Sequence, residues 1–281
     1  MGARRAARVA ALAAIAPGSI VGWLGLTPPA ASTPQWAAAS AATIHPGSVM
    51  LTDGAQCTAN FAFTRDADVF LGYAAHCAGT GAATETNGCD ARSLPLGTEV
   101  EIEGASHPGV LVYSSWLAMQ QVGERDADAC AHNDLGLVQI DSRDVGRVNP
   151  SVPHWGGPVG LNRTGNPNGA SVYTYGSSSL RLGITLLSPK SGFSMGTTAG
   201  GWATPAYTIT PGIPGDSGSA MLDAAGRASG VLSTVNITPM ALSNTFGDVQ
   251  HMLAYARVHG MGNVVLALGT EPFDGNQLPL G

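Results

Sequence analysis

Residues 211–220 read PGIPGDSGSA, a loop dense in glycine and proline that carries Ser217 between Asp216 and Gly218. Two other short segments carry reactive side chains. Residues 73–77, YAAHC, end a predicted strand with His76, and residues 132–137, HNDLGL, open another with Asp134 among apolar neighbours. The sequence therefore offers a serine hydroxyl, an imidazole and a carboxylate, each on a turn or at the end of a predicted element.

These three groups are the ones that nucleophilic acyl transfer requires. A serine hydroxyl is a weak nucleophile near neutral pH, so a base such as His76 must take its proton during attack. A carboxylate fixes the tautomer of the imidazole and stabilises the imidazolium. The glycines beside Ser217 allow the amides of Gly215 and Ser217 to point at one oxyanion, where each donor stabilises the transition state by roughly 3–4 kcal/mol.

Short runs rich in Val, Ile, Thr and Tyr recur between Gly, Pro, Asn and Ser breaks, which predicts an all-β barrel or sandwich. A single amphipathic helix is expected over 248–260, where apolar residues at helical spacing follow Asp248 and precede Gly260. A stretch rich in Pro, Gly and Asn at 149–168 is the best boundary between two β units. The expected strands include 99–103, 110–113, 135–140, 171–175, 180–187, 207–210, 230–233 and 263–268.

Composition excludes several classes of protein. Only 11% of the 281 residues are charged, and Gly (38) and Pro (18) are frequent, which argues against coiled coils and helical bundles. The net charge is −6, and the 13 Lys and Arg residues are scattered along the chain. Nucleic-acid binding needs a concentrated basic surface, so we expect no nucleic acid partner. The five tryptophans are scattered too, which suggests packing rather than a sugar-binding platform.

The N-terminus has the order of a secretory signal. Arg4, Arg5 and Arg8 precede an apolar run over 9–26, and small residues follow at 28–32. The alternative is a retained membrane anchor, but the run is near the lower limit for a membrane span, and Pro17-Gly18 would weaken a helix there. We expect cleavage between residues 30 and 42 and a secreted mature protein that is not bound to a membrane.

Four cysteines, Cys57, Cys77, Cys89 and Cys130, are an even number, and export to an oxidising compartment makes two disulfides the expected state. The cysteine count alone allows three pairings. A zinc site drawn from Cys57, His76, Cys77 and Cys89 is the alternative, but it lacks the C-x-x-C and H-E-x-x-H patterns. We therefore expect no metal and no cofactor.

The three reactive segments resemble, in order and in wording, the motifs of the chymotrypsin-fold serine proteases, most of all the secreted bacterial members. They follow one another at intervals of 58 (134−76) and 83 (217−134) residues. The resemblance covers residues 45–260 and implies two six-stranded antiparallel β-barrels with the active site between them. The chain would then comprise a signal peptide (1–31), an N-terminal β-barrel (43–148), a C-terminal β-barrel (149–247), a C-terminal α-helix (248–260) and a terminal strand and tail (261–281).

The resemblance also implies a role for each reactive residue. His76 would be the general base, Asp134 would orient it, and Ser217 would be the nucleophile of a catalytic triad. Gly215 and Ser217 would supply the oxyanion hole. The implied disulfides are Cys57–Cys77 and Cys89–Cys130.

Substrate contacts are implied in the same way. Pro211 would lie at the base of the primary pocket, and Ser233, Thr234 and Val235 would form the wall that pairs with the substrate backbone. No acidic residue lies at 211–214. A trypsin-like preference is therefore disfavoured, and we expect an apolar P1 residue, the residue before the cleaved bond.

The sequence departs from the animal members of the family ahead of the first barrel. Those proteins free a new N-terminus after a basic residue, whereas residues 32–64 contain no Lys or Arg. Asp216, which the new amine would contact, needs another partner, and we expect an arginine such as Arg163 or Arg181. We also expect the enzyme to be active once the signal is removed and the disulfides form.

The sequence as a whole predicts a secreted, monomeric serine endopeptidase that acts on polypeptides through an acyl-enzyme. Two alternatives stay open at this point. A serine esterase would use the same triad, because ester and amide acylation share their chemistry. A catalytically silent secreted binding protein would keep the fold without the activity.

Overall fold

The computed structural model describes residues 2, 34–82, 85–236 and 242–279. The predicted signal peptide (1–31) lies outside the described residues, apart from Gly2. Residues 32–281 form one compact unit, which contains all of the strands and helices named below. Within the described ranges, no helix is both long enough and apolar enough to cross a membrane.

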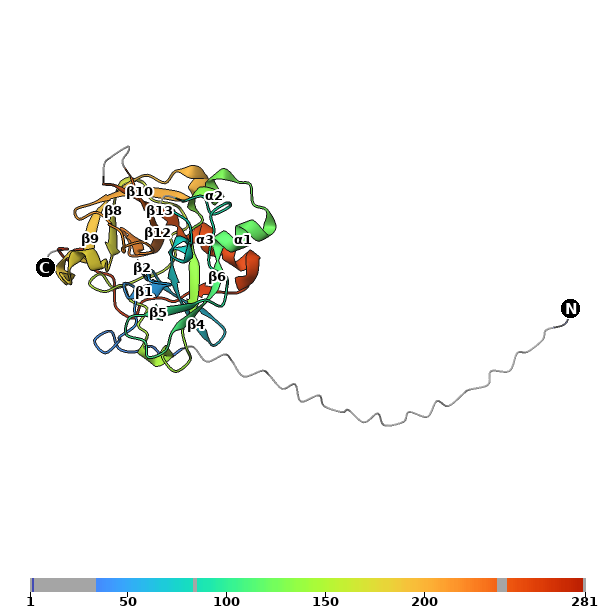
Figure 1. Ribbon diagram of the computed structural model, residues 1–281, viewed down its shortest axis with the longest axis horizontal. Helices are drawn as coiled ribbons and strands as arrows, with labels where there is room; N and C mark the ends of the chain where they lie inside the picture. The colour runs from blue at the N-terminus through green and yellow to red at the C-terminus, as the bar shows by residue number, and fades with distance from the viewer. Residues whose placement is uncertain (1, 3–33, 83–84, 237–241, 280–281) are drawn as a thin grey trace. The chain divides into compact units, whose positions relative to one another are not determined.

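Eight strands form the first antiparallel sheet (Figure 1). In β5 (Glu99–Ile102), Val100 and Ile102 are buried while the two glutamates are exposed, as expected for a strand with one face on a core. One edge strand comes from the C-terminal tail. In the order in which they pair, the strands are β14 (Val265–Leu266), β3 (Ala62–Arg65), β4 (Asp68–Tyr73), β7 (Gly136–Gln139), β6 (Gly109–Ser114), β5, β1 (Val49–Thr52) and β2 (Ala55–Thr58).

Six further strands form a closed antiparallel barrel. In the order in which they pair, they are β10 (Ala203–Thr208), β13 (Asn244–Asp248), β12 (Ala228–Val235), β11 (Ala220–Asp223), β8 (Asn168–Tyr175) and β9 (Pro189–Met195), and β9 pairs back onto β10. The expected all-β architecture of two antiparallel β-barrel sheets is thereby confirmed, although the first sheet has eight paired strands rather than the expected six. The division at residues 148 and 149 stays a prediction.

One apolar core extends through both sheets. It includes Phe70 and Leu71 of β4 together with Leu222 of β11 and Val231 of β12, all of which are fully buried. In β4, the last residue, Tyr73, pairs with Gly136, the first residue of β7. His76 follows β4 by three residues and Asp134 precedes β7 by two, so this register brings both residues to the same end of the two paired strands.

The expected C-terminal helix is confirmed as α3 (Val249–Ala256), which continues into a π-helical turn (Arg257–Met261). The Asp248 side chain accepts a hydrogen bond from the backbone N–H of His251 and so caps the helix start. Val249, Met252, Leu253 and Ala256 are buried, as their spacing predicts.

Two short helices were not expected. They are α1 (Ser115–Val122) and α2 (Ala127–His132), which gather with α3 on one side of the unit (Figure 1). Gly123 ends α1 in the left-handed region at φ 68°, and the Asp126 side chain caps α2 by accepting from Ala129. Both cap signals are present in the sequence, but the apolar residues of α1 run consecutively over 116–119 and α2 has only six residues, so neither shows the helical spacing that identifies α3.

The predicted strand at 180–187 is wrong. This segment contains two 3-10 turns, Ser179–Arg181 and Thr185–Leu187. Between them, Leu182 and Gly183 adopt φ of 55° and 77°, a left-handed conformation that interrupts an extended chain. The other 3-10 turns are Ala75–Ala78, Val145–Arg147 and Ala199–Gly201.

Candidate active site

His76 and Asp134 form a hydrogen-bonded pair. The Nδ1 atom of His76 lies 2.6 Å from Oδ2 of Asp134, and the backbone N–H of His76 donates to Oδ1 at 2.8 Å. Asp134 is 3% exposed, whereas the His76 side chain is 26% exposed. With Asp134 ionised, Nδ1 carries the proton, which leaves Nε2 of His76 as the proton acceptor.

Burial and charge oppose each other in this pair. Desolvation disfavours a charged imidazole, but the Asp134 carboxylate outweighs it and raises the pKa of His76 above its ordinary 6.5. Burial likewise disfavours a charged carboxylate, yet His76 and the hydroxyl of Ser233 hold the pKa of Asp134 below its ordinary 3.8. Asp134 is therefore ionised at neutral pH and can stabilise an imidazolium.

Ser217 lies on a turn that requires glycine on both sides. Gly215 has a φ of +94° and Gly218 a φ of +89°, where side chains are strained. A Cβ on Gly218 would also lie 2.5 Å from the carbonyl oxygen of Thr58. The backbone thus turns sharply at Ser217, whose side chain is partly exposed.

Thr58 connects this turn to His76. Its backbone N–H donates to the Ser217 carbonyl at 2.8 Å, and its hydroxyl donates to the Gly215 carbonyl at 2.8 Å. The preceding residue, Cys57, forms a disulfide with Cys77, which directly follows His76. The structure therefore brings together the three reactive segments that the sequence singles out.

Solved structures with a similar fold exist. The chain is similar to Thermobifida fusca Protease A, with a TM-score of 0.51 and 18% identity over 82% of this chain and 100% of that chain. The fold is that of the chymotrypsin-like serine proteases. Nocardiopsis protease (TM-score 0.47, 19% identity, 79% of this chain, 98% of that chain) and Cellulomonas bogoriensis chymotrypsin (TM-score 0.44, 18% identity, 76% of this chain, 96% of that chain) are also similar. No protein-family model and no curated protein matches the sequence.

Within this chymotrypsin fold, Asp216 has the arginine partner that the sequence leads us to expect. Nη2 of Arg181 lies 2.7 Å from its Oδ2, while Arg163, the other candidate, is exposed. The carboxylate also accepts from the backbone N–H groups of Ile213 at 3.1 Å and Ser178 at 3.0 Å. Asp216 thus fixes the Ser217 turn without a newly cut N-terminus.

Lys190 is a second cation beside Asp216, and sequence reasoning missed it. Its Nζ atom lies 3.5 Å from Oδ2 of Asp216 and donates to the Ser188 carbonyl at 3.1 Å. Burial lowers the pKa of Lys190 to about 8, against the opposing effect of Asp216. Lys190 is the only lysine in the sequence and is 1% exposed. A single lysine is noticeable in the sequence, but its position in a strand does not show which distant carboxylate it contacts.

Replacing Asp216 with asparagine should destabilise the protein by about 3–5 kcal/mol, because two buried cations lose their shared anion. Arg181 and Lys190 are only 9% and 1% exposed, so water cannot replace the carboxylate. The measurement is urea unfolding followed by circular dichroism. Asp141→Asn is the matched control, since Asp141 pairs with Arg143, whose side chain is 64% exposed. Equal unfolding midpoints for the two variants would contradict the role given to Asp216.

One residue of the predicted substrate wall, Ser233, has an additional contact. The hydroxyl of Ser233 donates to Oδ2 of Asp134 at 2.6 Å, so this residue supports the His76–Asp134 pair directly. Thr234 and Val235 continue β12, with Val235 46% exposed at its end. Pro211 offers its carbonyl to Nη2 of Arg181 at 2.9 Å. The pairing of this wall with substrate, and a pocket above Pro211, stay predictions.

The structure contains both disulfides that the resemblance implies, Cys57–Cys77 and Cys89–Cys130, with Cα–Cα distances of 6.1 and 5.2 Å. Cys57, His76 and Cys77 lie close enough together to be considered as metal ligands. However, the sulfurs of Cys57 and Cys77 are bonded to each other, and zinc takes cysteine as the thiolate. The three cysteines of the zinc alternative are therefore committed to disulfides.

Proposed function

We propose that the chain is a secreted serine endopeptidase that cleaves peptide bonds through an acyl-enzyme. The observation that carries this proposal is the hydrogen-bonded Asp134–His76 pair, which the Cys57–Cys77 bridge and Thr58 connect to the Ser217 turn. The protease fold of Thermobifida fusca Protease A supports it. Secretion is supported by the two disulfides, which persist in oxidising compartments.

Acylation begins when Oγ of Ser217 attacks the carbonyl carbon of the scissile peptide bond and Nε2 of His76 takes its proton. The carbonyl oxygen becomes an oxyanion, and Asp134 stabilises the imidazolium. His76 then gives this proton to the leaving nitrogen as the C–N bond breaks. The N-terminal part of the substrate remains as an ester on Ser217, and the C-terminal part leaves as an amine.

Deacylation repeats these steps with water. His76 takes a proton from water as its oxygen attacks the ester carbon, and it returns a proton to Oγ of Ser217 as the ester C–O bond breaks. The product leaves as a carboxylic acid that ionises in solution. His76 and Ser217 are restored, so no cofactor is required.

The amides of Gly215 and Ser217 are the proposed oxyanion donors. The neighbouring amides of Asp216, Gly218 and Ser219 already donate to protein carbonyls at 2.8, 2.7 and 3.0 Å. By contrast, no hydrogen bond formed among the described residues uses the N–H of Gly215 or Ser217. Two free N–H groups on the turn that carries the nucleophile support this role.

Peptide cleavage tests the proposed function. The oxidised protein is incubated with a mixed peptide library, and mass spectrometry identifies the new ends. We expect cleavage after apolar residues, since Arg181 at the Pro211 carbonyl is already paired with Asp216 and no acidic side chain lies at 211–214. Cleavage after Arg or Lys would contradict the P1 proposal. An intact library with hydrolysis of simple esters would favour an esterase.

The rate of hydrolysis should fall on the acid side with a midpoint above pH 6.5, because only the neutral imidazole accepts the proton and the pKa of His76 is raised. The sign follows from Asp134, which stabilises the protonated form and so keeps His76 protonated to higher pH. The measurement is the pH dependence of kcat/KM, with circular dichroism as a check of folding. A midpoint at or below 6.5 would contradict the pairing.

A further inference from the structure

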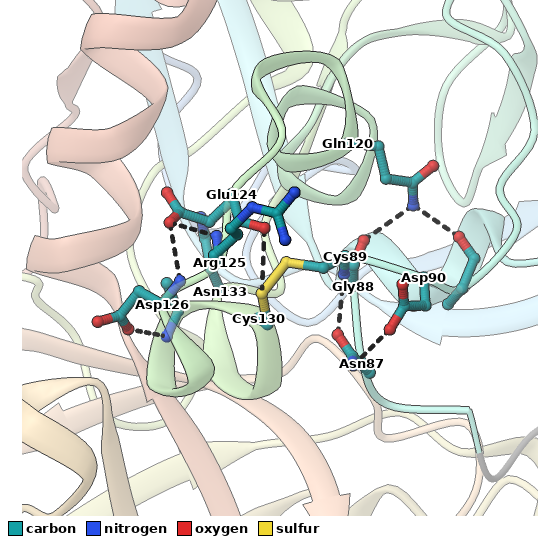
Figure 2. Close-up of a disulfide and its surroundings, with 12 residues drawn as sticks. Asn87, Gly88, Cys89, Asp90, Gln120, Glu124, Arg125, Asp126, Cys130 and Asn133 are labelled. Carbon is teal, nitrogen blue, oxygen red and sulfur yellow. Dashed lines mark hydrogen bonds between the residues drawn. A yellow bond between two sulfur atoms is a disulfide. The ribbon is translucent and has the colours of Figure 1, made fainter.

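A second, smaller apolar core lies beneath the segment that carries His76. Its buried members are Ala75, Ala91, Trp116, Met119 and Ala129, and it is separate from the main core. They come from the turn before His76, from the 87–91 loop, from α1 and from α2. Cys89 packs against this small core and is bonded to Cys130 of α2, so a disulfide closes it (Figure 2).

Trp116 is the largest member of the small core and the one beside His76. Its indole is 3% exposed, and the two ring centroids are 6.4 Å apart with their planes tilted by 43°. A Cβ on Gly88 would lie 2.2 Å from the indole, and one on Gly79 would lie 3.4 Å from it. The indole therefore fills the space between His76 and two close backbone segments.

Ser115, the first residue of α1, is hydrogen-bonded to the residues on both sides of Asp134. The hydroxyl of Ser115 donates to the Asn133 carbonyl at 2.7 Å and accepts from the backbone N–H of Leu135 at 2.9 Å. The backbone N–H of Ser115 donates to the Leu135 carbonyl at 2.9 Å. Ser115 thus holds the segment that carries Asp134, and the next residue, Trp116, lies beside the imidazole of His76.

The other end of α1 is hydrogen-bonded to the 87–91 loop, which carries Cys89. Figure 2 shows Gln120, whose Nε2 donates to the carbonyls of Gly88 and Ala91 at 2.8 and 2.7 Å. The backbone N–H of Gly88 donates in turn to the Cys130 carbonyl at 2.8 Å. The disulfide, the loop and α1 therefore form one connected support behind Trp116.

We propose that Trp116 is a positioning residue for His76 and that the Cys89–Cys130 disulfide keeps it in place. The indole restricts the imidazole to orientations that keep Nδ1 on Asp134, and it excludes water from that side of the ring. The kinetic part of this inference rests on the proposed function. The hydrogen bond of His76 to Asp134 can be measured without turnover, so this inference and the proposed function can fail separately.

The charges around His76 allow the effect of the indole to be isolated. In the described part of the chain, Asp134 is the charged group that faces the ring. Helix α1 has no titratable side chain, the Cys57–Cys77 sulfurs are bonded, and Ser217 and Ser233 face the site from the barrel elements. Asp216, beside Ser217, is paired with Arg181 and Lys190. Removing the indole thus changes no charge near the ring; it admits water and lets Nδ1 leave Oδ2 of Asp134, so the bond between these two atoms is what reports the effect.

The kinetic experiment compares Trp116→Leu with Trp202→Leu. Trp202 packs against the same small core but neighbours His251 and Tyr255 rather than His76. Trp116→Leu should lower kcat by about 10²-fold with little change in KM, because small misplacements of a base carry costs of this size. Trp116→Phe should restore most of the rate, and Trp202→Leu should keep it. A raised KM with unchanged kcat would overturn the proposal, because the indole would then contact substrate.

The second experiment follows the Nδ1 proton of His76 by NMR in a Ser217→Ala background, which needs no turnover. This proton lies in the hydrogen bond to Oδ2 of Asp134. Trp116→Leu should weaken or abolish its resonance, and Trp202→Leu should leave the resonance in place. Cys89→Ala with Cys130→Ala should weaken it to a smaller extent, and this double variant decides the matter where Trp116→Leu does not fold. An unchanged Nδ1 proton resonance in these variants would overturn the proposal, whatever the outcome of the peptide assay.

Discussion

Ser217→Ala should lower kcat for peptide hydrolysis by about 10⁶-fold while the fold is retained, because removing the nucleophile of a serine triad eliminates nearly all of its catalysis. The structure explains why the turn should survive. Thr58 binds it through the carbonyls of Ser217 and Gly215, and the backbone N–H of Gly218 donates to Leu232 at 2.7 Å. Alanine keeps all of these backbone contacts.

The measurement is steady-state hydrolysis of a peptide selected from the library, with thermal unfolding as the test of folding. Ser142→Ala is the control, since Ser142 is an exposed serine far from the turn in sequence, and it should retain the parent rate. A folded Ser217→Ala protein with more than a hundredth of the parent kcat would show that the nucleophile lies elsewhere.

Asp134→Asn should lower kcat by about 10⁴-fold. Oδ1 accepts from the backbone of His76, and Oδ2 accepts from Nδ1 and from Ser233, so the carboxylate sets both the ring orientation and its tautomer. An amide nitrogen in place of Oδ2 is a donor, and it favours the tautomer in which Nε2 carries the proton. That tautomer cannot accept the proton of Ser217.

A second histidine–aspartate pair provides a matched control. His107 and Asp144 form another pair, with Nδ1 3.0 Å from Oδ2 and Asp144 1% exposed. Asp144→Asn should reduce stability but leave kcat within a few-fold of the parent. Asp134→Asn should also move the acid midpoint of any remaining activity to lower pH, because the anion that raises the pKa of His76 is gone. Equal effects of the two substitutions on kcat would refute the assigned role.

The site segments could be predicted because their chemistry is local in sequence. Gly215 and Gly218 are needed where φ is positive, and His76 and Asp134 lie at strand ends that pair with one another. The partner of Asp216 could only be narrowed to Arg163 or Arg181. The choice depends on the 3-10 turn at Ser179–Arg181, whereas the composition of 180–187 wrongly predicts a strand there.

The support behind His76 could not be predicted for a different reason. Trp116 was expected to pack, but its neighbour depends on α1, a helix of eight residues with no detectable period. The Cys89–Cys130 pairing spans 41 residues, and the sequence alone does not show that this bridge closes a small core beneath His76. Contacts of this kind depend on the tertiary arrangement of short elements.

The most direct test of the central claim is mass spectrometry of the oxidised protein after treatment with a fluorophosphonate, with Ser217→Ala as the control. Such reagents label a serine only when a neighbouring base activates it. One adduct, mapped to Ser217 and missing from the variant, is the result predicted by the His76–Asp134 geometry. A folded, disulfide-intact protein that gains no adduct, or gains it on another residue, would contradict the account.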